Sequence, residues 1–210
     1  KFEYDITTVP GKTFLKTVKD ALDNILETHA YDPQGRATTS EKHGGVERYT
    51  LEFRQYDMTY GEFTRVTDAL GRITKYFPKT VYGTDLIIRT EGECSCSGGS
   101  QAVTYTYDTS NSWLNLVKKT DALNRDTVYT YDGNRNIIAV TDVLGIRSFT
   151  YNSLGEVLTA TDRMGGVTTN TYSSAGNLLT TKDALNNTTT FAYTSLGQPA
   201  TINDALNHTT

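Results

Sequence analysis

The chain has 210 residues, of which 37% are hydrophobic and 21% are charged, and its net charge is −4. This mildly acidic, mixed surface argues against a nucleic-acid groove or a patch for anionic membranes, and no apolar run is long enough to span a membrane. Tyrosine outnumbers phenylalanine by 14 to 7, which favours half-wet surfaces where the ring packs and the hydroxyl meets solvent.

The first part of the chain is predicted to form short strands joined by turns. Phe2-Glu-Tyr4 and Tyr49-Thr-Leu-Glu-Phe53 alternate with a period of two, which is typical of strands with one packed face. Pro10-Gly11 indicates a turn. Phe53 and Tyr56 are three residues apart instead of two, which indicates a β-bulge.

Residues 77–102 form the irregular stretch. Tyr82-Gly83 is interpreted as a worn copy of a tyrosine turn, and the Gly/Ser-rich segment around Cys94 and Cys96 as an exposed loop. Because the pattern resumes at Tyr105-Thr-Tyr-Asp108, the stretch is predicted to be one degenerate unit and not a linker between domains.

The last ninety residues repeat two motifs. A tetrad such as Asp-Ala-Leu-Asn recurs every 20 or 21 residues, and a tyrosine precedes each following tetrad by 11 residues. Such a fixed period is the sequence signature of a repeat architecture. The aspartates are Asp121, Asp142, Asp162, Asp183 and Asp204, and the tyrosines are Tyr131, Tyr151, Tyr172 and Tyr193.

One unit reads as a β-hairpin. Thr188–Tyr193 is rich in β-branched and aromatic residues, and 199–202 is a second short strand. A turn containing Gly197 joins them, and the turn at Asp204 follows. One unit cannot bury its own aromatic face, whereas stacked units can. We therefore expect an all-β fold in which the tyrosines stack and the aspartates form turns.

These motifs resemble a known family. Thr67-Asp-Ala-Leu-Gly-Arg72 and Thr127-Val-Tyr-Thr-Tyr-Asp132 are similar to the YD repeat of Rhs proteins, wall-associated bacterial proteins, insecticidal Tc toxin shells and teneurins. The resemblance is strong over 105–210, clear over 49–76 and looser elsewhere. It implies tandem hairpins in a spiralling antiparallel sheet, as a shell, tube or filament segment. Residues 1–210 then form a single array of about nine units.

The resemblance also implies a function. It implies a structural scaffold outside a bacterial cell or on its surface. We further expect this scaffold to be non-catalytic and to bind no cofactor or metal, because no such residue pattern is visible in the sequence, and the mixed charge argues against nucleic acid. Two alternatives stay open: a surface adhesion module that recognises glycans or a receptor through tyrosine rows, and an excerpt of a toxin-encapsulating Rhs shell. Solvent-exposed tyrosines would favour binding, and covered tyrosines would favour the scaffold.

Catalytic chemistry has few candidates. The aspartates recur in every unit, whereas an acid–base pair needs a single place that separates two pKa values, and no loop gathers the carboxylates of a calcium site. His29 falls in a strand position and is expected to pack, His208 falls in a variable turn position and is expected to be exposed, and His43 lies in a degenerate turn. We therefore predict no catalytic residue.

Cys94 and Cys96 are the only concentrated reactive groups. Two cysteines do not make a zinc site, and a bridge between residues two apart is geometrically tight. A local or cross-strand disulfide, free thiols, and metal or intermolecular bonding stay open, and the family resemblance favours a structural staple. The sequons at Asn186, Asn187 and Asn207 coincide with the tetrad turns and are interpreted as turns.

Written head to tail, the two ends of the sequence would continue the repeat in register. Residues 204–210 followed by Lys1–Asp5 match 121–132 in length and in every landmark. We hypothesise that Thr210 is continued by Lys1, either of another copy in a head-to-tail filament or within a longer tandem array. A plain excerpt of a larger shell is the alternative.

Overall fold

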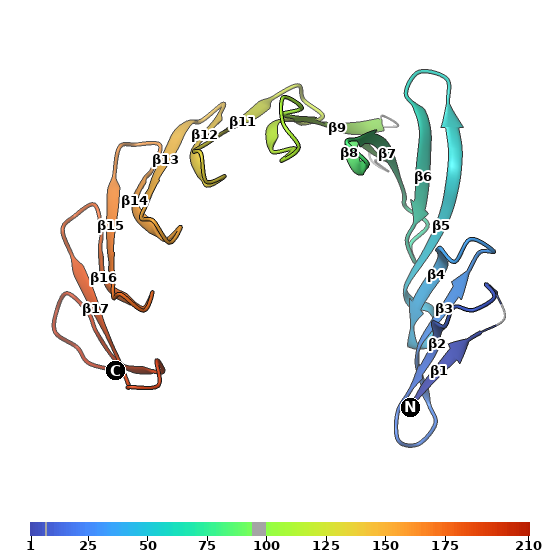
Figure 1. The fold of residues 1–210 in the computed structure, drawn as a ribbon, viewed down its shortest axis with the longest axis horizontal. Helices are drawn as coiled ribbons and strands as arrows, with labels where there is room; N and C mark the ends of the chain where they lie inside the picture. Colours follow the sequence, from blue (N-terminus) through green and yellow to red (C-terminus); the bar gives the residue numbers. More distant parts are fainter. Residues whose placement is uncertain (7, 94–99) are drawn as a thin grey trace. The chain divides into compact units, whose positions relative to one another are not determined.

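The computed structural model describes residues 1–6, 8–93 and 100–210 (Figure 1). Within these residues the regular structure is β-strand, apart from one short 3-10 turn, η1 (His43–Gly45). The predicted all-β, antiparallel fold class is therefore confirmed. The chain divides into two compact units, an amino-terminal unit of Lys1–Tyr105 and a carboxy-terminal unit of Thr106–Thr210.

The amino-terminal unit is a meander in which each strand pairs antiparallel with the next (Figure 1). Its last strand extends to Tyr107. The strands are β1 (Phe2–Asp5), β2 (Phe14–Lys19), β3 (Ile25–Tyr31), β4 (Ala37–Lys42), β5 (Val46–Asp57), β6 (Gly61–Thr67), β7 (Ile73–Val81), β8 (Thr84–Glu93) and β9 (Ser100–Tyr107).

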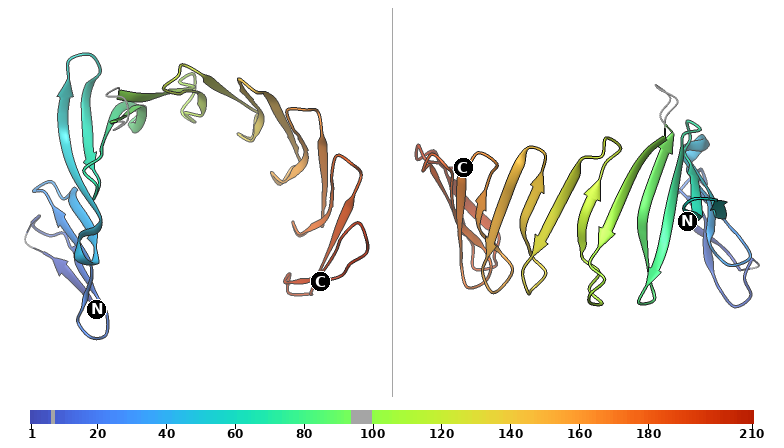
Figure 2. Two further views of the ribbon diagram at one scale, coloured as in Figure 1. Left: turned by 180° about the vertical axis from the view of Figure 1, so that it is seen from behind. Right: turned by 90° about the horizontal axis from the view of Figure 1, so that it is seen from above.

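The carboxy-terminal unit is a second, more regular meander. Its strands also pair antiparallel in chain order, and Figure 2 shows them side by side from above. They are β10 (Leu116–Thr120), β11 (Asp126–Tyr131), β12 (Ile137–Asp142), β13 (Gly145–Tyr151), β14 (Val157–Thr161), β15 (Val167–Tyr172), β16 (Leu178–Lys182), β17 (Thr188–Tyr193) and β18 (Pro199–Asn203).

The two faces of these strands differ, as a period of two requires. In β11 and β15 exposed and half-buried residues alternate strictly, and the tyrosines lie on the half-buried face. The other face is rich in threonine. There the hydroxyl oxygens of Thr150 and Thr159 are 2.6 Å apart, and those of Thr171 and Thr180 are 2.7 Å apart. Cross-strand threonine pairs of this kind stabilise sheets.

Most strand connections are the same five-residue turn. In 121–125 the amide of Asn124 donates to the carbonyl of Asp121, and the amide of Asp121 donates to the carbonyl of Arg125, both at 3.0 Å. Asn124 has φ 58°, a left-handed conformation that Gly and Asn tolerate best. This is a type I turn with a G1 bulge. It recurs at 20–24, 32–36, 68–72, 132–136, 152–156, 162–166, 173–177, 183–187, 194–198 and 204–208.

A second bulge follows each tyrosine turn of the carboxy-terminal unit. Thr130 pairs with Ala139 and Tyr131 pairs with Ile137, so Ile138 is the extra residue. The same shift recurs at the later tyrosines. In β5 the register shifts between Glu52 and Gln55, which confirms the bulge predicted from the spacing of Phe53 and Tyr56.

The irregular stretch contains the most buried side chain of the described residues. β7 and β8 form a long hairpin closed by Tyr82 and Gly83, with φ of 49° and 77°, the conformation of a two-residue type I′ turn. Phe77 is fully buried beneath Phe63 and Tyr60, with ring centroids 5.3 and 5.7 Å away. Cys94 and Cys96, for which a disulfide is one of the possibilities left open, lie outside the described residues. The single array of about nine units stays a prediction.

Candidate functional site

The tyrosine hydroxyls connect successive hairpins. The Tyr151 hydroxyl donates to the carbonyl of Ile137 at 2.7 Å, and Ile137 is the residue that pairs with Tyr131. The Tyr172 hydroxyl donates to the carbonyl of Val157 at 3.0 Å, and Val157 pairs with Tyr151. Each of these tyrosines therefore ties its own hairpin to the hairpin before it. We call this arrangement the tyrosine ladder.

The ladder extends beyond these two members. Tyr131 donates to the carbonyl of Leu116 at 2.8 Å, and Tyr31 of the amino-terminal unit donates to the carbonyl of Leu15 at 2.7 Å. Burial raises the pKa of Tyr31, Tyr131 and Tyr151, as expected for phenols withdrawn from water. Tyr193 is also half-buried, but among the described residues it has no equivalent bond.

The recurring aspartates cap the turns that they begin. Asp183 accepts the amides of Leu185 and Asn187 on one oxygen, both at 2.8 Å, and the Asn187 side chain on the other at 2.8 Å. Asp121, Asp162 and Asp204 accept the same two amides. Side-chain caps of this kind offset the loss of backbone pairing in a turn.

Asp142 is the exception among these aspartates. It pairs directly with Gly145, so its turn has only two central residues, and this explains why the next tetrad follows after 20 residues instead of 21. Its carboxylate accepts the amide of Leu144 at 2.9 Å and forms an ion pair with Arg163 of the following turn.

Hydrogen bonds favour the ionised form of Asp121, Asp183 and Asp204. The side chain and amide of Arg125 lower the pKa of Asp121 to about 2. The Asn187 side chain lowers the pKa of Asp183, and the His208 amide and ring lower that of Asp204. The pKa values of Asp121, Asp183 and Asp204 are thus all lowered, whereas an acid–base pair needs two values pushed apart.

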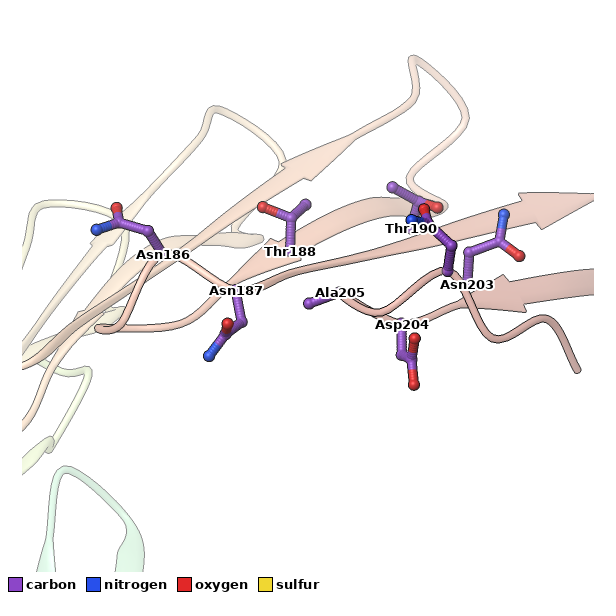
Figure 3. Close-up of a pocket in the computed structure, with 8 residues that line it drawn as sticks. Asn186, Asn187, Thr188, Thr190, Asn203, Asp204 and Ala205 are labelled. Atoms are coloured by element: carbon purple, nitrogen blue, oxygen red, sulfur yellow. The ribbon is translucent and has the colours of Figure 1, made fainter.

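A shallow hollow lies between the last two tetrad turns (Figure 3). Its volume is about 440 Å³. Figure 3 shows its side chains spread along two turns and two strand ends, without convergence on one point. Its lining is almost wholly polar: Asn186, Asn187, Thr188, Thr190, Asn203, Asp204, Ala205 and Asn207.

The histidines are dispersed. His29 is half-buried in β3 with its Nδ1 3.1 Å from the Ser40 hydroxyl, while His43 and His208 are exposed. Across residues 1–6, 8–93 and 100–210, no three His, Cys, Asp or Glu side chains gather as a metal site. Among the same residues, no helix has the length and apolar character needed to cross a membrane.

Sequence reasoning missed the ladder bonds and the buried centre at Phe77. The alternation in the sequence assigned each tyrosine to one face of its strand, and we expected its hydroxyl to be solvated. In the structure, four tyrosine hydroxyls instead donate to backbone carbonyls. The constant offset between the tyrosine and tetrad beats is the signal that could have indicated a bond repeated once per hairpin.

Comparisons with known proteins agree with this geometry. The RHS Repeat family matches residues 111–147 and 172–209. The crystal structure of TcdB2-TccC3-Cdc42 is similar over 97% of this chain, with a TM-score of 0.55 and 13% identity. That of TcdB2-TccC3 without hypervariable C-terminal region is similar over 91%, with a TM-score of 0.58 and 11% identity. This chain covers 12% of each of those chains. No curated protein matches. The resemblance to YD-repeat proteins is thus confirmed.

Proposed function

Because the chain carries RHS repeats, we propose that it is a structural scaffold, one segment of a β-repeat shell or tube wall that lies outside the cell or on its surface. The observation that supports this most directly is the tyrosine ladder, in which the Tyr151 and Tyr172 hydroxyls each bond to the preceding hairpin. A bond repeated from hairpin to hairpin serves to extend a sheet, and its nearest-neighbour character is typical of repeat arrays.

The similar structures support the shell form of this proposal. They share the fold of this chain, and the chain spans about an eighth of their length. In this reading the segment is part of a larger enclosing wall, and the toxin-encapsulating shell is one member of the class. The proposed role is non-catalytic, with the aspartates and tyrosines as the structural residues of each repeat.

The rival function, glycan or receptor binding by tyrosine rows, has less support. The tyrosines of the ladder are half-buried, and their hydroxyls donate hydrogen bonds to backbone carbonyls. A sugar-binding aromatic row needs an open ring face and free polar groups. The covered tyrosines therefore favour the scaffold.

The proposed partner is more of the same repeat. Beside β18, Thr210 already exchanges two backbone hydrogen bonds with Ile202, both at 2.9 Å, and Asn203 forms a bridge with Thr209. These residues occupy the place that 126–127 take beside β10. We propose that a further strand completes this pairing by strand addition, either from later repeats or from Lys1–Asp5 of another copy.

Electron microscopy of the purified 210-residue chain, combined with a glycan array, tests the proposed function. A scaffold should appear as curved or extended walls of β-sheet and should bind no glycan selectively. A particle without an extended sheet, or selective glycan binding that is lost in Tyr151→Ala and Tyr172→Ala, would contradict the scaffold reading.

A further inference from the structure

One edge of the carboxy-terminal unit carries an unbroken row of exposed apolar side chains. Each tetrad turn presents one such residue at its third position, and all are between 70% and 96% exposed. We call this row the leucine rim; its members are Leu123, Leu144, Met164, Leu185 and Leu206.

The turn itself explains its first two residues but not the leucine. In 183–187, Asp183 caps the amides, and Ala184 lies close to the preceding turn, since a Cβ built on Gly166 would be 3.2 Å from the Ala184 Cβ. Leu185 is 82% exposed. Because it is so exposed, the Leu185 side chain contributes almost nothing to the stability of this unit.

The opposite edge of the same unit supplies an internal comparison. Its turns have the same hydrogen bonds and the same positive φ at the fourth residue. The third position there is Asn134, Leu154, Ala175 and Leu196. The turn geometry thus accepts a polar or small residue, and the unbroken apolar rim at the tetrad edge is not a requirement of turn chemistry. An exposed apolar side chain that recurs at the same position of every tetrad turn forms a regular apolar row, and exposed apolar surface in excess of the scattered norm marks an interaction site.

The aspartates beside the leucine rim also have their charge compensated by hydrogen bonds or ion pairs. Asp121 is paired with Arg125, and Asp142 is paired with Arg163. The carboxylates of Asp162 and Asp183 accept hydrogen bonds from turn amides. Two such rims can therefore approach each other without facing a row of unpaired like charges.

Pitch and area point to the same occupant. Rim residues recur once per hairpin, a spacing of roughly 9–10 Å set by two strand separations. A second copy of the rim has the same pitch, so that each of its side chains meets one of the first, whereas a partner without the repeat cannot match this spacing at every position. Five such side chains offer about 500 Å², a substantial part of the ~800 Å² that each partner buries in a standard interface.

We propose that the leucine rim is a docking surface for the leucine rim of a second copy of this chain. The two rims run antiparallel about a twofold axis, so Met164 meets Met164 of the partner, and Leu123 meets Leu206 of the partner. This contact rests on the proposed scaffold function and deepens it, because it joins repeat walls side by side, whereas strand addition at β18 joins them end to end.

The first test is sedimentation velocity of the full chain over a range of concentrations. Replacing Leu123, Leu144, Leu185 and Leu206 by Gln should weaken self-association at least tenfold. The matched control replaces Leu154 and Leu196, which are equally exposed at the opposite edge, by Gln, and should leave association unchanged. Unchanged circular dichroism will show that the variants fold. A wild-type chain that stays monomeric, or equal effects of both sets, overturns the proposal.

The second test is disulfide cross-linking in a Cys94→Ser, Cys96→Ser background. Met164→Cys should cross-link to itself in two copies, and a mixture of Leu123→Cys and Leu206→Cys should form the mixed dimer. Leu154→Cys is the control. Equal cross-linking by Met164→Cys and Leu154→Cys contradicts the twofold contact. End-to-end joining at β18 would be insensitive to the rim variants, so loss of the rim contact and failure of the scaffold function give different results.

Discussion

Removing the Tyr151 hydroxyl should lower the free energy of unfolding of the chain by an amount that can be worked out from the structure. In Tyr151→Phe the ring stays in place and only the bond to the Ile137 carbonyl, 2.7 Å long, is lost. An intramolecular hydrogen bond contributes about 1 kcal/mol net, and water can reach part of this half-buried site, which keeps the loss near that figure instead of the larger cost of a buried orphan group. We expect the free energy of unfolding to fall by about 1 kcal/mol.

The chain provides its own control for this change. Tyr193 occupies the same repeat position and is half-buried, but among the described residues it makes no ladder bond. Tyr193→Phe should change the free energy of unfolding by less than about 0.5 kcal/mol. Urea titration followed by circular dichroism measures both, with the slope m as a check that the unfolded state is unchanged. Equal losses in the two variants would refute the ladder as a source of stability.

Three further outcomes are expected. Tyr172→Ala should cost about 3 kcal/mol and His208→Ala under about 1 kcal/mol, since the first loses a packed ring and the second an exposed one; similar midpoints in urea would contradict this. Arg135 has φ 71° at the turn position where most other copies have Gly or Asn, so Arg135→Gly should raise stability by about 0.5–1 kcal/mol, and a lower melting temperature would show that its contacts outweigh the strain. The pKa of Asp121 is lowered to about 2 by Arg125, below its unfolded value, so its contribution is present above pH 4 and is lost as the pH falls toward 2; Asp121→Asn should flatten the melting temperature against pH in that range, and an unchanged profile would rule this out.

The strands and turns were predictable because they depend on local chemistry. Alternation placed Tyr129 and Tyr131 on one face, and the Asp and Gly letters marked the turns. The bulge between Phe53 and Tyr56 was readable from a spacing of three, since one extra residue reverses the face of every residue that follows.

The bonds between hairpins were not predictable in the same way. A period of two assigns a face to Tyr151 but not the offset between neighbouring hairpins, which decides whether its hydroxyl reaches the carbonyl of Ile137. Phe77 was missed for a different reason. It lies in the stretch where the repeat letters fail, and there the core is set by contacts with Phe63 and Tyr60 from another hairpin.

The carboxylate bonds within turns and the tyrosine bonds between hairpins stabilise different parts of the repeat. The carboxylate bonds of Asp121 and Asp183 close within five residues, so a turn can change length without disturbing its neighbours. The turn at Asp142 does so: it is shorter, yet β12 and β13 stay in register and Tyr151 still reaches Ile137. The ladder bonds instead join adjacent hairpins. Stability is then a sum of hairpin terms and neighbour terms, which allows an array to lengthen by whole repeats while each turn varies on its own.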